Sequence, residues 1–153
     1  MAIAGKMSGH RLAVLPSDTI TFGDFKKLYP SGEVLSTDTG VMRQYGSDPY
    51  GDYYTSNNLY FPVTHEDARL PKKELIFGVL IDGKAKAYHA SAIQKKGEIT
   101  DHFAGKTIIA RMEDESGAIR FYETVDGTRE RITPISAYWF VWVAAYPQTE
   151  LYK

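Results

Sequence analysis

The residues of this chain that are best suited to chemistry lie between positions 38 and 54, where charged and tyrosine side chains occur close together. Five of the eleven tyrosines fall between Tyr45 and Tyr60, among aspartate, serine, asparagine and glycine residues. Tyrosines offer flat apolar rings and hydroxyl groups, while carboxylates and a guanidinium can orient a polar ligand. The segment therefore predicts a site for a polar ligand with an apolar face, such as a sugar, or for a protein partner. The candidate ligand-binding residues are Asp38, Arg43, Tyr45, Asp48, Tyr50, Tyr53 and Tyr54.

The same segment also has a structural interpretation. Asp48-Pro49-Tyr50-Gly51 fits a type I turn, and the composition is typical of a long ordered loop. In this alternative the loop is a lid whose rings fill the surface of the domain, since tyrosine pairs are ordinary packing units. A catalytic version of the site would use Asp38 or Asp48 as the general base in hydrolysis of a polar small molecule.

Other signals for catalysis or for a cofactor are weak. Asp38-Thr39-Gly40 resembles the triplet of aspartic proteases, and one triplet per chain would suit a homodimeric protease. However, the preceding Ser36-Thr37 is polar where a buried catalytic loop needs apolar neighbours, so a turn is favoured. The four histidines form no closely spaced pair, the chain has no cysteine, and no glycine-rich phosphate loop occurs. We therefore expect no metal, no cofactor and no enzymatic activity.

A segment near the carboxyl end, from Tyr138 to Tyr146, contains no charged residue. A helix that is apolar on every side is buried on every side, either within its own domain or against another chain. Two tryptophans three residues apart are typical of an interface, and they favour a homo-oligomer. The candidate interface residues are Tyr138, Trp139, Trp142 and Tyr146.

The two ends of the chain resemble each other, over residues 9–35 and 127–152. Both contain an aromatic helical segment followed by a Tyr-Pro pair, and such a repeat usually indicates a repeated packing task. In the first copy we expect an extended segment over 11–15 and then a helix capped by Thr21 and stopped by Pro30. We expect Ser136 to cap the helix of the second copy. The aromatic residues on one face of the first helix are Phe22, Phe25 and Tyr29.

From residue 75 onward, alternating apolar residues and turn signals predict a β-meander. Asp82-Gly83 is a two-residue hairpin signal, and a short helix is expected over 90–96. The expected strands are 75–81, 84–89, 99–103, 106–112, 118–123 and 129–132. The predicted class is α+β: a single domain over 1–153, rich in antiparallel sheet, with two short related helices and a long ordered tyrosine-rich loop.

Composition narrows the range of partners. The net charge is −1, with 18 basic and 19 acidic residues, so the basic excess of a nucleic-acid-binding protein is absent. No apolar run is long enough to span a bilayer, and no export signal is visible. We expect neither nucleic acid nor membrane as a partner. For the sequence as given, the expected location is the cytoplasm. If the chain is cut from a longer precursor, we expect it to be exported.

The loop and the repeated ends together resemble a bacterial family described as domain of unknown function 3179. The residues that carry the resemblance include Leu35-Ser36-Thr37-Asp38-Thr39-Gly40, Asp48-Pro49-Tyr50-Gly51, Ala85-Lys86-Ala87-Tyr88 and Trp139-Phe140-Val141-Trp142. The resemblance is to the C-terminal half only of longer members, whose upstream half has a cysteine-containing segment. It implies no known reaction, because the family has no assigned activity.

These observations lead to one functional hypothesis and two alternatives. We expect a self-associating binding domain without evident catalytic machinery. The first alternative is a small-molecule-binding or hydrolytic pocket under the tyrosine-rich loop 38–54. The second is a regulatory module that docks a partner protein.

Overall fold

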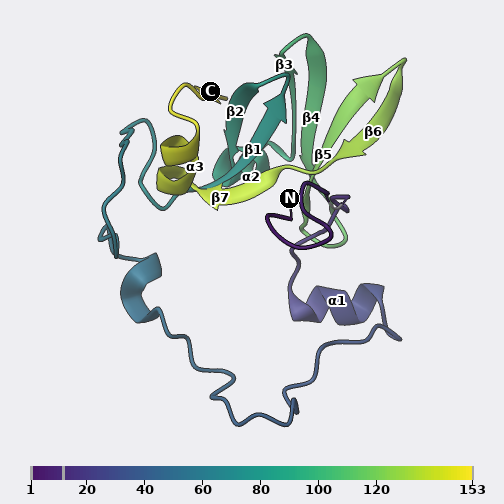
Figure 1. Ribbon diagram of the computed structural model, residues 1–153. Helices are drawn as coiled ribbons and strands as arrows, with labels where there is room; N and C mark the ends of the chain where they lie inside the picture. Colours follow the sequence, from purple (N-terminus) through teal and green to yellow (C-terminus); the bar gives the residue numbers. More distant parts are fainter. Residues whose placement is uncertain (1, 12, 153) are drawn as a thin grey trace.

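The computed structural model describes residues 2–11 and 13–152. Its helical elements are α1 (Phe22–Leu28), a 3-10 turn η1 (Gly51–Tyr54), α2 (Ala90–Lys96) and α3 (Trp139–Ala145). Its strands are β1 (Leu75–Ile81), β2 (Lys84–His89), β3 (Glu98–Phe103), β4 (Lys106–Met112), β5 (Ile119–Val125), β6 (Thr128–Ile132), β7 (Ile135–Tyr138) and β8 (Glu150–Leu151). They form two four-stranded sheets, ordered β7-β1-β2-β8 and β3-β4-β5-β6 (Figure 1). The α+β class rich in antiparallel sheet is confirmed: β2 and β8 pair in parallel, and the other strand pairs of the described residues are antiparallel.

The predicted hairpin at Asp82-Gly83 is confirmed. Asp82 and Gly83 have φ angles of 49° and 77°, as a two-residue turn that matches the twist of the flanking strands requires. It joins β1 to β2 in an antiparallel register that pairs Phe77 with Tyr88. Because side chains alternate along a strand, this register gives the first sheet two different apolar faces.

The inner face of the first sheet packs against the second sheet. Val79, Tyr88, Ile108 and Phe121 are buried between them, together with Ile93 of α2. Such a two-layer arrangement buries the apolar side of both sheets at once.

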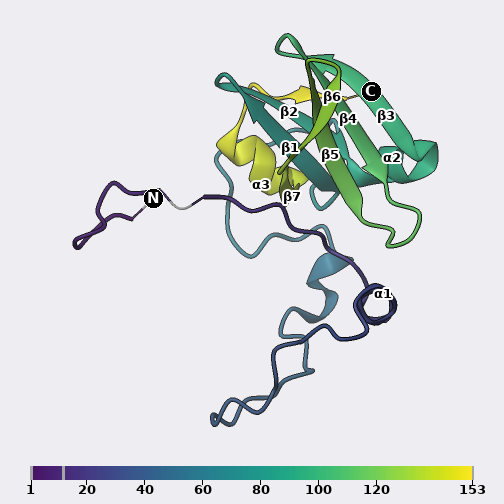
Figure 2. The ribbon, with the colours of Figure 1, turned by 90° about the vertical axis from the view of Figure 1, so that its right-hand side faces the viewer.

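The outer face of the first sheet receives α3 (Figure 2). Ile76 and Ala87 on this face pack against Trp139 and Trp142. Gly78 makes the close approach possible, since a Cβ atom there would lie 2.2 Å from the Trp142 ring. The first sheet is thus covered on both sides, and the small residues on its outer face accept large aromatic rings.

The segment that precedes β1 lies largely outside these layers. Between α1 and η1 the chain runs in an arc away from the sheets (Figure 1), and residues 31–52 are all exposed. Residues 11 and 13–15 form no strand, in contrast to the extended strand expected there. Within the described part of the chain, no helix is long and apolar enough to cross a membrane.

Candidate functional site

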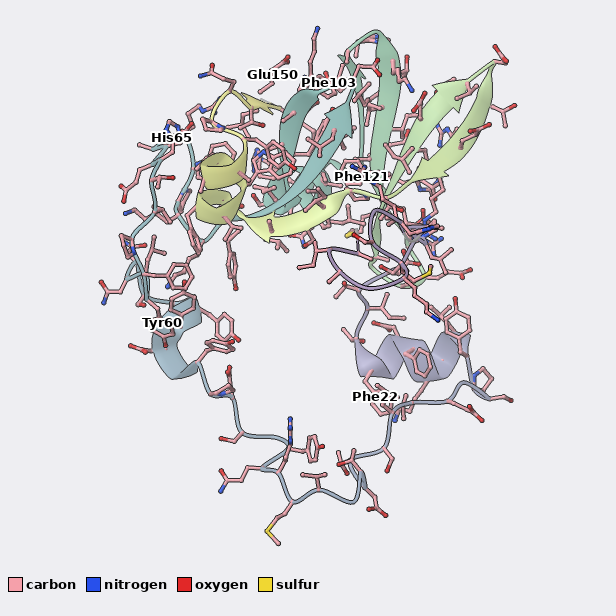
Figure 3. The ribbon with its side chains drawn as sticks, in the orientation of Figure 1. Phe22, Tyr60, His65, Phe103, Phe121 and Glu150 are labelled. Carbon is pink, nitrogen blue, oxygen red and sulfur yellow. The ribbon has the colours of Figure 1, made fainter. Side chains whose placement is uncertain are left out.

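The tyrosine-rich loop folds into a ring cluster at η1. Tyr50, Tyr53, Tyr54 and Tyr60 pack on one another, and the closest ring centroids, of Tyr53 and Tyr60, are 4.3 Å apart (Figure 3). Lys73 lies over the Tyr53 ring at 3.4 Å from its centroid. Its ammonium donates to the backbone carbonyls of Tyr53 and of Ser56, the latter at 2.7 Å. This lysine therefore ties the cluster to the start of β1.

Two of the three charged candidate residues of the loop, Asp38 and Arg43, do not join this cluster. Asp48 accepts a hydrogen bond from the backbone N–H of Tyr50 at 2.9 Å, which closes a local turn. Tyr45 shares a hydrogen bond of 3.0 Å with the hydroxyl of Thr39. Asp38 and Arg43 are exposed on the arc between α1 and η1. These local bonds favour a structural role for Asp48 and Tyr45, and a ligand site at residues 38–54 stays a prediction.

The two tryptophans of α3 are buried within their own chain. Trp139 and Trp142 are 0% and 1% exposed, because both rings lie on the outer face of the first sheet. Their indole N–H groups donate to the Asp67 carbonyl at 2.9 Å and to the Thr149 hydroxyl at 2.8 Å. The hypothesis that these two rings meet another subunit is therefore corrected. The segment also has an exposed side, since Val141 is 47% exposed.

The remaining two interface candidates, Tyr138 and Tyr146, are half-buried. Tyr146 packs its ring against Trp142, with centroids 4.3 Å apart. Tyr138 is the N-terminal flanking residue of α3, and Ser136 lies in β7; the expected cap at Ser136 was wrong because β7 continues up to the helix. Both tyrosines thus pack against rings of α3, since the Tyr138 ring also stacks on that of Phe140 with centroids 6.3 Å apart.

The first helix is a local copy of α3. The residues before the two helices, Thr21 and Tyr138, have φ, ψ angles of −69°, 152° and −75°, 149°. Those after them, Tyr29 and Tyr146, have −129°, 70° and −131°, 73°. The cap expected from the sequence is confirmed, since the Thr21 hydroxyl accepts from the backbone N–H of Asp24 at 3.1 Å. The sequence repeat is therefore also a repeat of backbone conformation.

The two copies differ in what covers them. α3 buries four of its residues, whereas α1 buries none. Phe22 and Tyr29 are 59% and 53% exposed, and Phe22 lies far from core residues such as Phe121 (Figure 3). The aromatic face of α1 therefore has the form of a packing surface without a sheet to pack on.

A buried polar cluster links the two sheets. Lys86 of β2 is 8% exposed, and its ammonium lies 2.6 Å from a carboxylate oxygen of Asp101 on β3. The Tyr88 hydroxyl donates to the same oxygen at 2.8 Å. Burial, and then this hydrogen bond, raise the pKa of Tyr88. Sequence reasoning missed this cluster; the signal was the Lys-Ala alternation of β2, whose alanines face α3 and whose Lys86 consequently faces inward.

A hydroxyl on α2 gives the closest approach to a catalytic arrangement that we find among the described residues. Ser91 donates to the Glu74 carboxylate at 2.8 Å, and its oxygen lies 3.0 Å from Nδ1 of His89. In a hydrolase the histidine accepts the hydroxyl proton and the carboxylate orients the histidine. Here the serine lies between the histidine and the glutamate, and its hydroxyl donates a hydrogen bond to Glu74. This arrangement does not suit nucleophilic catalysis, because the histidine does not accept the hydroxyl proton.

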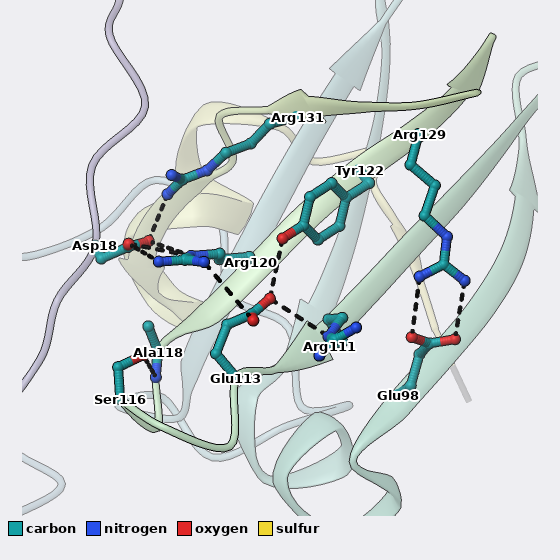
Figure 4. Close-up of polar contacts among 10 residues, drawn as sticks. All are labelled: Asp18, Glu98, Arg111, Glu113, Ser116, Ala118, Arg120, Tyr122, Arg129 and Arg131. Atoms are coloured by element: carbon teal, nitrogen blue, oxygen red, sulfur yellow. Dashed lines mark hydrogen bonds and ion pairs between the residues drawn. The ribbon is translucent and has the colours of Figure 1, made fainter. Parts of the chain in front are cut away.

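A second polar cluster lies on the second sheet (Figure 4). In it Arg120 binds Asp18, a residue more than 100 positions earlier in the sequence. Arg120 of β5 donates to both oxygens of Asp18, from Nε at 3.2 and 3.1 Å and from Nη2 at 2.7 Å. Arg131 of β6 donates to the same carboxylate and to the Ser17 carbonyl, the latter at 3.3 Å. Two arginines thus hold residues 17 and 18 against the sheet. Sequence reasoning missed this contact, since neither partner stands in a recognisable motif.

Three further residues complete this cluster. Arg111 pairs with Arg120 across the β4–β5 ladder, which places two like charges side by side. Glu113 lies between them, 3.3 Å from Arg111 and 3.7 Å from Arg120, and it accepts a hydrogen bond from the Tyr122 hydroxyl at 2.9 Å. The carboxylates of Glu113 and Asp18 therefore offset much of the repulsion between the arginines.

The Asp18 contact has a definite pH dependence. The hydrogen bond from Arg120 holds the pKa of Asp18 below its ordinary value of 3.8, against the opposing effect of partial burial. A depressed pKa in the folded state contributes stability above the unfolded value and loses it as the pH falls through the folded value. We expect the contact to be unchanged between pH 7 and 5 and to break only below 3.8.

Carbon-detected NMR titration of the Asp18 carboxyl would measure this midpoint. Arg120→Gln should return the midpoint toward the ordinary value, because the main cause of the depression is then removed. A wild-type midpoint at or above 3.8 would contradict the contact in solution.

Fold and polar clusters together define an α+β domain whose described residues contain no group of three or more His, Asp or Glu side chains able to hold a metal. The chain belongs to the family described as "Protein of unknown function (DUF3179)", whose sequence model matches residues 1–149. The match spans essentially the whole chain, which corrects the expectation of a resemblance to a C-terminal half only. No curated protein and no solved structure matches significantly.

Proposed function

We propose that this chain is a non-enzymatic binding domain that self-associates through the aromatic face of α1. One observation carries the proposal: α1 has the backbone geometry and aromatic spacing of α3, but it buries none of its residues. Burial of a large aromatic side chain contributes about 1.5–3 kcal/mol. An open face of this kind therefore gains free energy when a second apolar surface covers it.

A second copy of the chain is the occupant that fits this face. The outer face of the first sheet, which holds α3, is already filled within each copy. The second copy's α1 therefore offers a matching open stripe, in which Phe22, Phe25 and Tyr29 recur at i, i+3 and i+7. This spacing suits the pairing of two helices. A two-fold arrangement needs only one such surface, because each copy presents the same one.

The chain that follows α1 adds apolar area next to the helix. Val34 and Leu35 are 60% and 100% exposed, and Val41 and Met42 are 59% and 101% exposed. These four exposed residues lie on the segment that follows α1. They support an interface larger than α1 alone, because the area of a seven-residue helix is small.

Substitution of Phe22 by aspartate should shift the chain from dimer to monomer. An acidic residue in the first turn is compatible with the helix, so the change acts on the aromatic face and not on helix formation. Size-exclusion chromatography with light scattering, over a series of concentrations of the full chain, would measure the mass. Phe61→Asp is the matched control, because Phe61 is 61% exposed, close to the 59% of Phe22, and lies outside α1.

Four outcomes are informative. A wild-type dimer that only Phe22→Asp dissociates supports the proposal. A wild-type chain that stays monomeric at high concentration overturns self-association. A dimer that both variants leave intact overturns the assignment to α1, and a complex of the monomer with a different protein would favour the regulatory module instead.

A further inference from the structure

The space between the two sheets is not completely filled. A cavity of about 360 Å³ lies where β1 and β7 meet β5 and β6, beside α2. Its apolar wall includes Phe77, Ile119, Phe121 and Ile132. Phe121 is fully buried, but the other three are only partly buried although they face the core. Protein interiors are normally close-packed, so inward-facing side chains that remain accessible mark a place where a ligand can be accommodated.

Charged side chains stand at the edge of this apolar space. Arg120 and Arg131 line the cavity together with the backbone segment around Ser17. Both guanidinium groups point at one carboxylate, that of Asp18, which Arg120 binds through two nitrogens (Figure 4). Arginine forks of this kind recognise planar carboxylates through paired hydrogen bonds.

The carboxylate bound by the arginine pair belongs to a segment without regular secondary structure. Residues 13–17 are exposed and form no helix or strand. Its hydrogen bonds to the second sheet are those that Asp18 and the Ser17 carbonyl accept from the two arginines. Asp18 is thus an intramolecular carboxylate that is held at the edge of an apolar cavity.

The charge balance also favours an anionic ligand. Arg111, Arg120 and Arg131 face the carboxylates of Glu113 and Asp18, so the group keeps one positive charge in excess. When Asp18 leaves, the excess becomes two, and a monoanion restores the present balance. A neutral ligand would leave Arg131 without the carboxylate it now binds, and Arg120 with Glu113 alone at 3.7 Å, which is costly in a partly buried place.

We propose that this cavity binds a small monocarboxylic acid with an apolar body, and that Asp18 is its built-in competitor. The carboxylate of the ligand takes the place of Asp18 on Arg120 and Arg131, and its apolar body enters the space beside Phe77 and Ile132. The free protein therefore binds the acid weakly, because only the fraction with Asp18 released is competent. Removal of residues 16–19 from the edge of the cavity accompanies binding.

Isothermal titration calorimetry with the full chain at low ionic strength would test this proposal. The probe is 4-phenylbutanoate, and the neutral probe of the same shape is 4-phenylbutan-1-ol. Asp18→Asn should bind the acid about tenfold more tightly than the wild type, because the competitor is gone. Glu33→Gln is the matched control, since Glu33 is an exposed acidic residue that also lies in the segment before β1. This substitution should leave the affinity unchanged.

A second substitution tests the arginine pair. Arg131→Gln in the Asp18→Asn background should weaken acid binding by about tenfold, as expected for loss of one charged hydrogen bond. The near-ultraviolet circular dichroism of the buried tryptophans would report whether each variant remains folded. If folded Asp18→Asn binds the acid no better than the wild type, or gains equally for the alcohol, the proposal is overturned. The titrations are made at a concentration where light scattering gives all variants the same oligomeric state, so that self-association through α1 does not affect the comparison.

Discussion

Replacing Trp139 by alanine should lower the free energy of unfolding by about 3–5 kcal/mol, the range for truncation of a fully buried large aromatic residue. Trp139 is 0% exposed and packs on the outer face of the first sheet. Its indole N–H satisfies the Asp67 carbonyl at 2.9 Å, and Arg69 lies over its ring at 5.2 Å from the centroid. The substitution removes all three contributions and leaves a cavity under α3.

Phe22→Ala is the matched control, because Phe22 holds the same place in α1 as Trp139 in α3. Phe22 is 59% exposed, so we expect a change within about 0.5 kcal/mol. Guanidinium unfolding followed by far-ultraviolet circular dichroism, at concentrations where the chain is monomeric, would measure both. Equal losses for the two variants would show that α1 is packed as α3 is, and would remove the basis of the proposed self-association.

Replacing Asp101 by leucine should destabilise the chain by about 3 kcal/mol, near the lower limit for breaking a buried ion pair. The Lys86 ammonium then keeps only Glu150, whose carboxylate is 3.7 Å away and largely exposed, and the Tyr88 hydroxyl loses its acceptor. An uncompensated charge between two sheets is costly because water cannot reach it fully.

The double variant Lys86→Met, Asp101→Leu separates the cost of the orphaned charge from that of lost packing. It should be more stable than Asp101→Leu alone by about 2 kcal/mol, since no buried charge then lacks a partner. The same unfolding measurement applies. A double variant as unstable as, or less stable than, Asp101→Leu would show that the pair is not buried in the way described.

Much of the second half of the chain could be predicted from local patterns. The Asp82-Gly83 turn, the strands beside it and the helix over 90–96 follow from backbone preferences and alternation. β7 and β8 were missed because they are short and their partners lie far away in sequence. Within the tyrosine-rich loop, composition predicted that the rings would pack together. It could not predict that Tyr50, Tyr53 and Tyr54 would join Tyr60 while Asp38 and Arg43 stay apart.

The polar clusters could not be predicted in this way. Asp18 and Arg120 are 102 positions apart, and Lys86 faces Asp101 only because β2 and β3 belong to different sheets that pack face to face. Nothing in either local sequence indicates its partner. The candidate acid-binding cavity could not be predicted for the same reason, since its walls come from the two sheets, α2 and residues 16–19.

The two related helices show most directly what the sequence decided and what the tertiary structure decided. The sequence by itself determined that residues 22–28 and 139–145 form short helices with the same ends, because prolines and hydrogen bonds within one turn act locally. Only the tertiary structure decided which helix is buried. A sheet with Gly78 on its outer face covers α3, while no element of the described chain covers α1 in this way, because burial depends on surfaces that distant parts of the chain bring together.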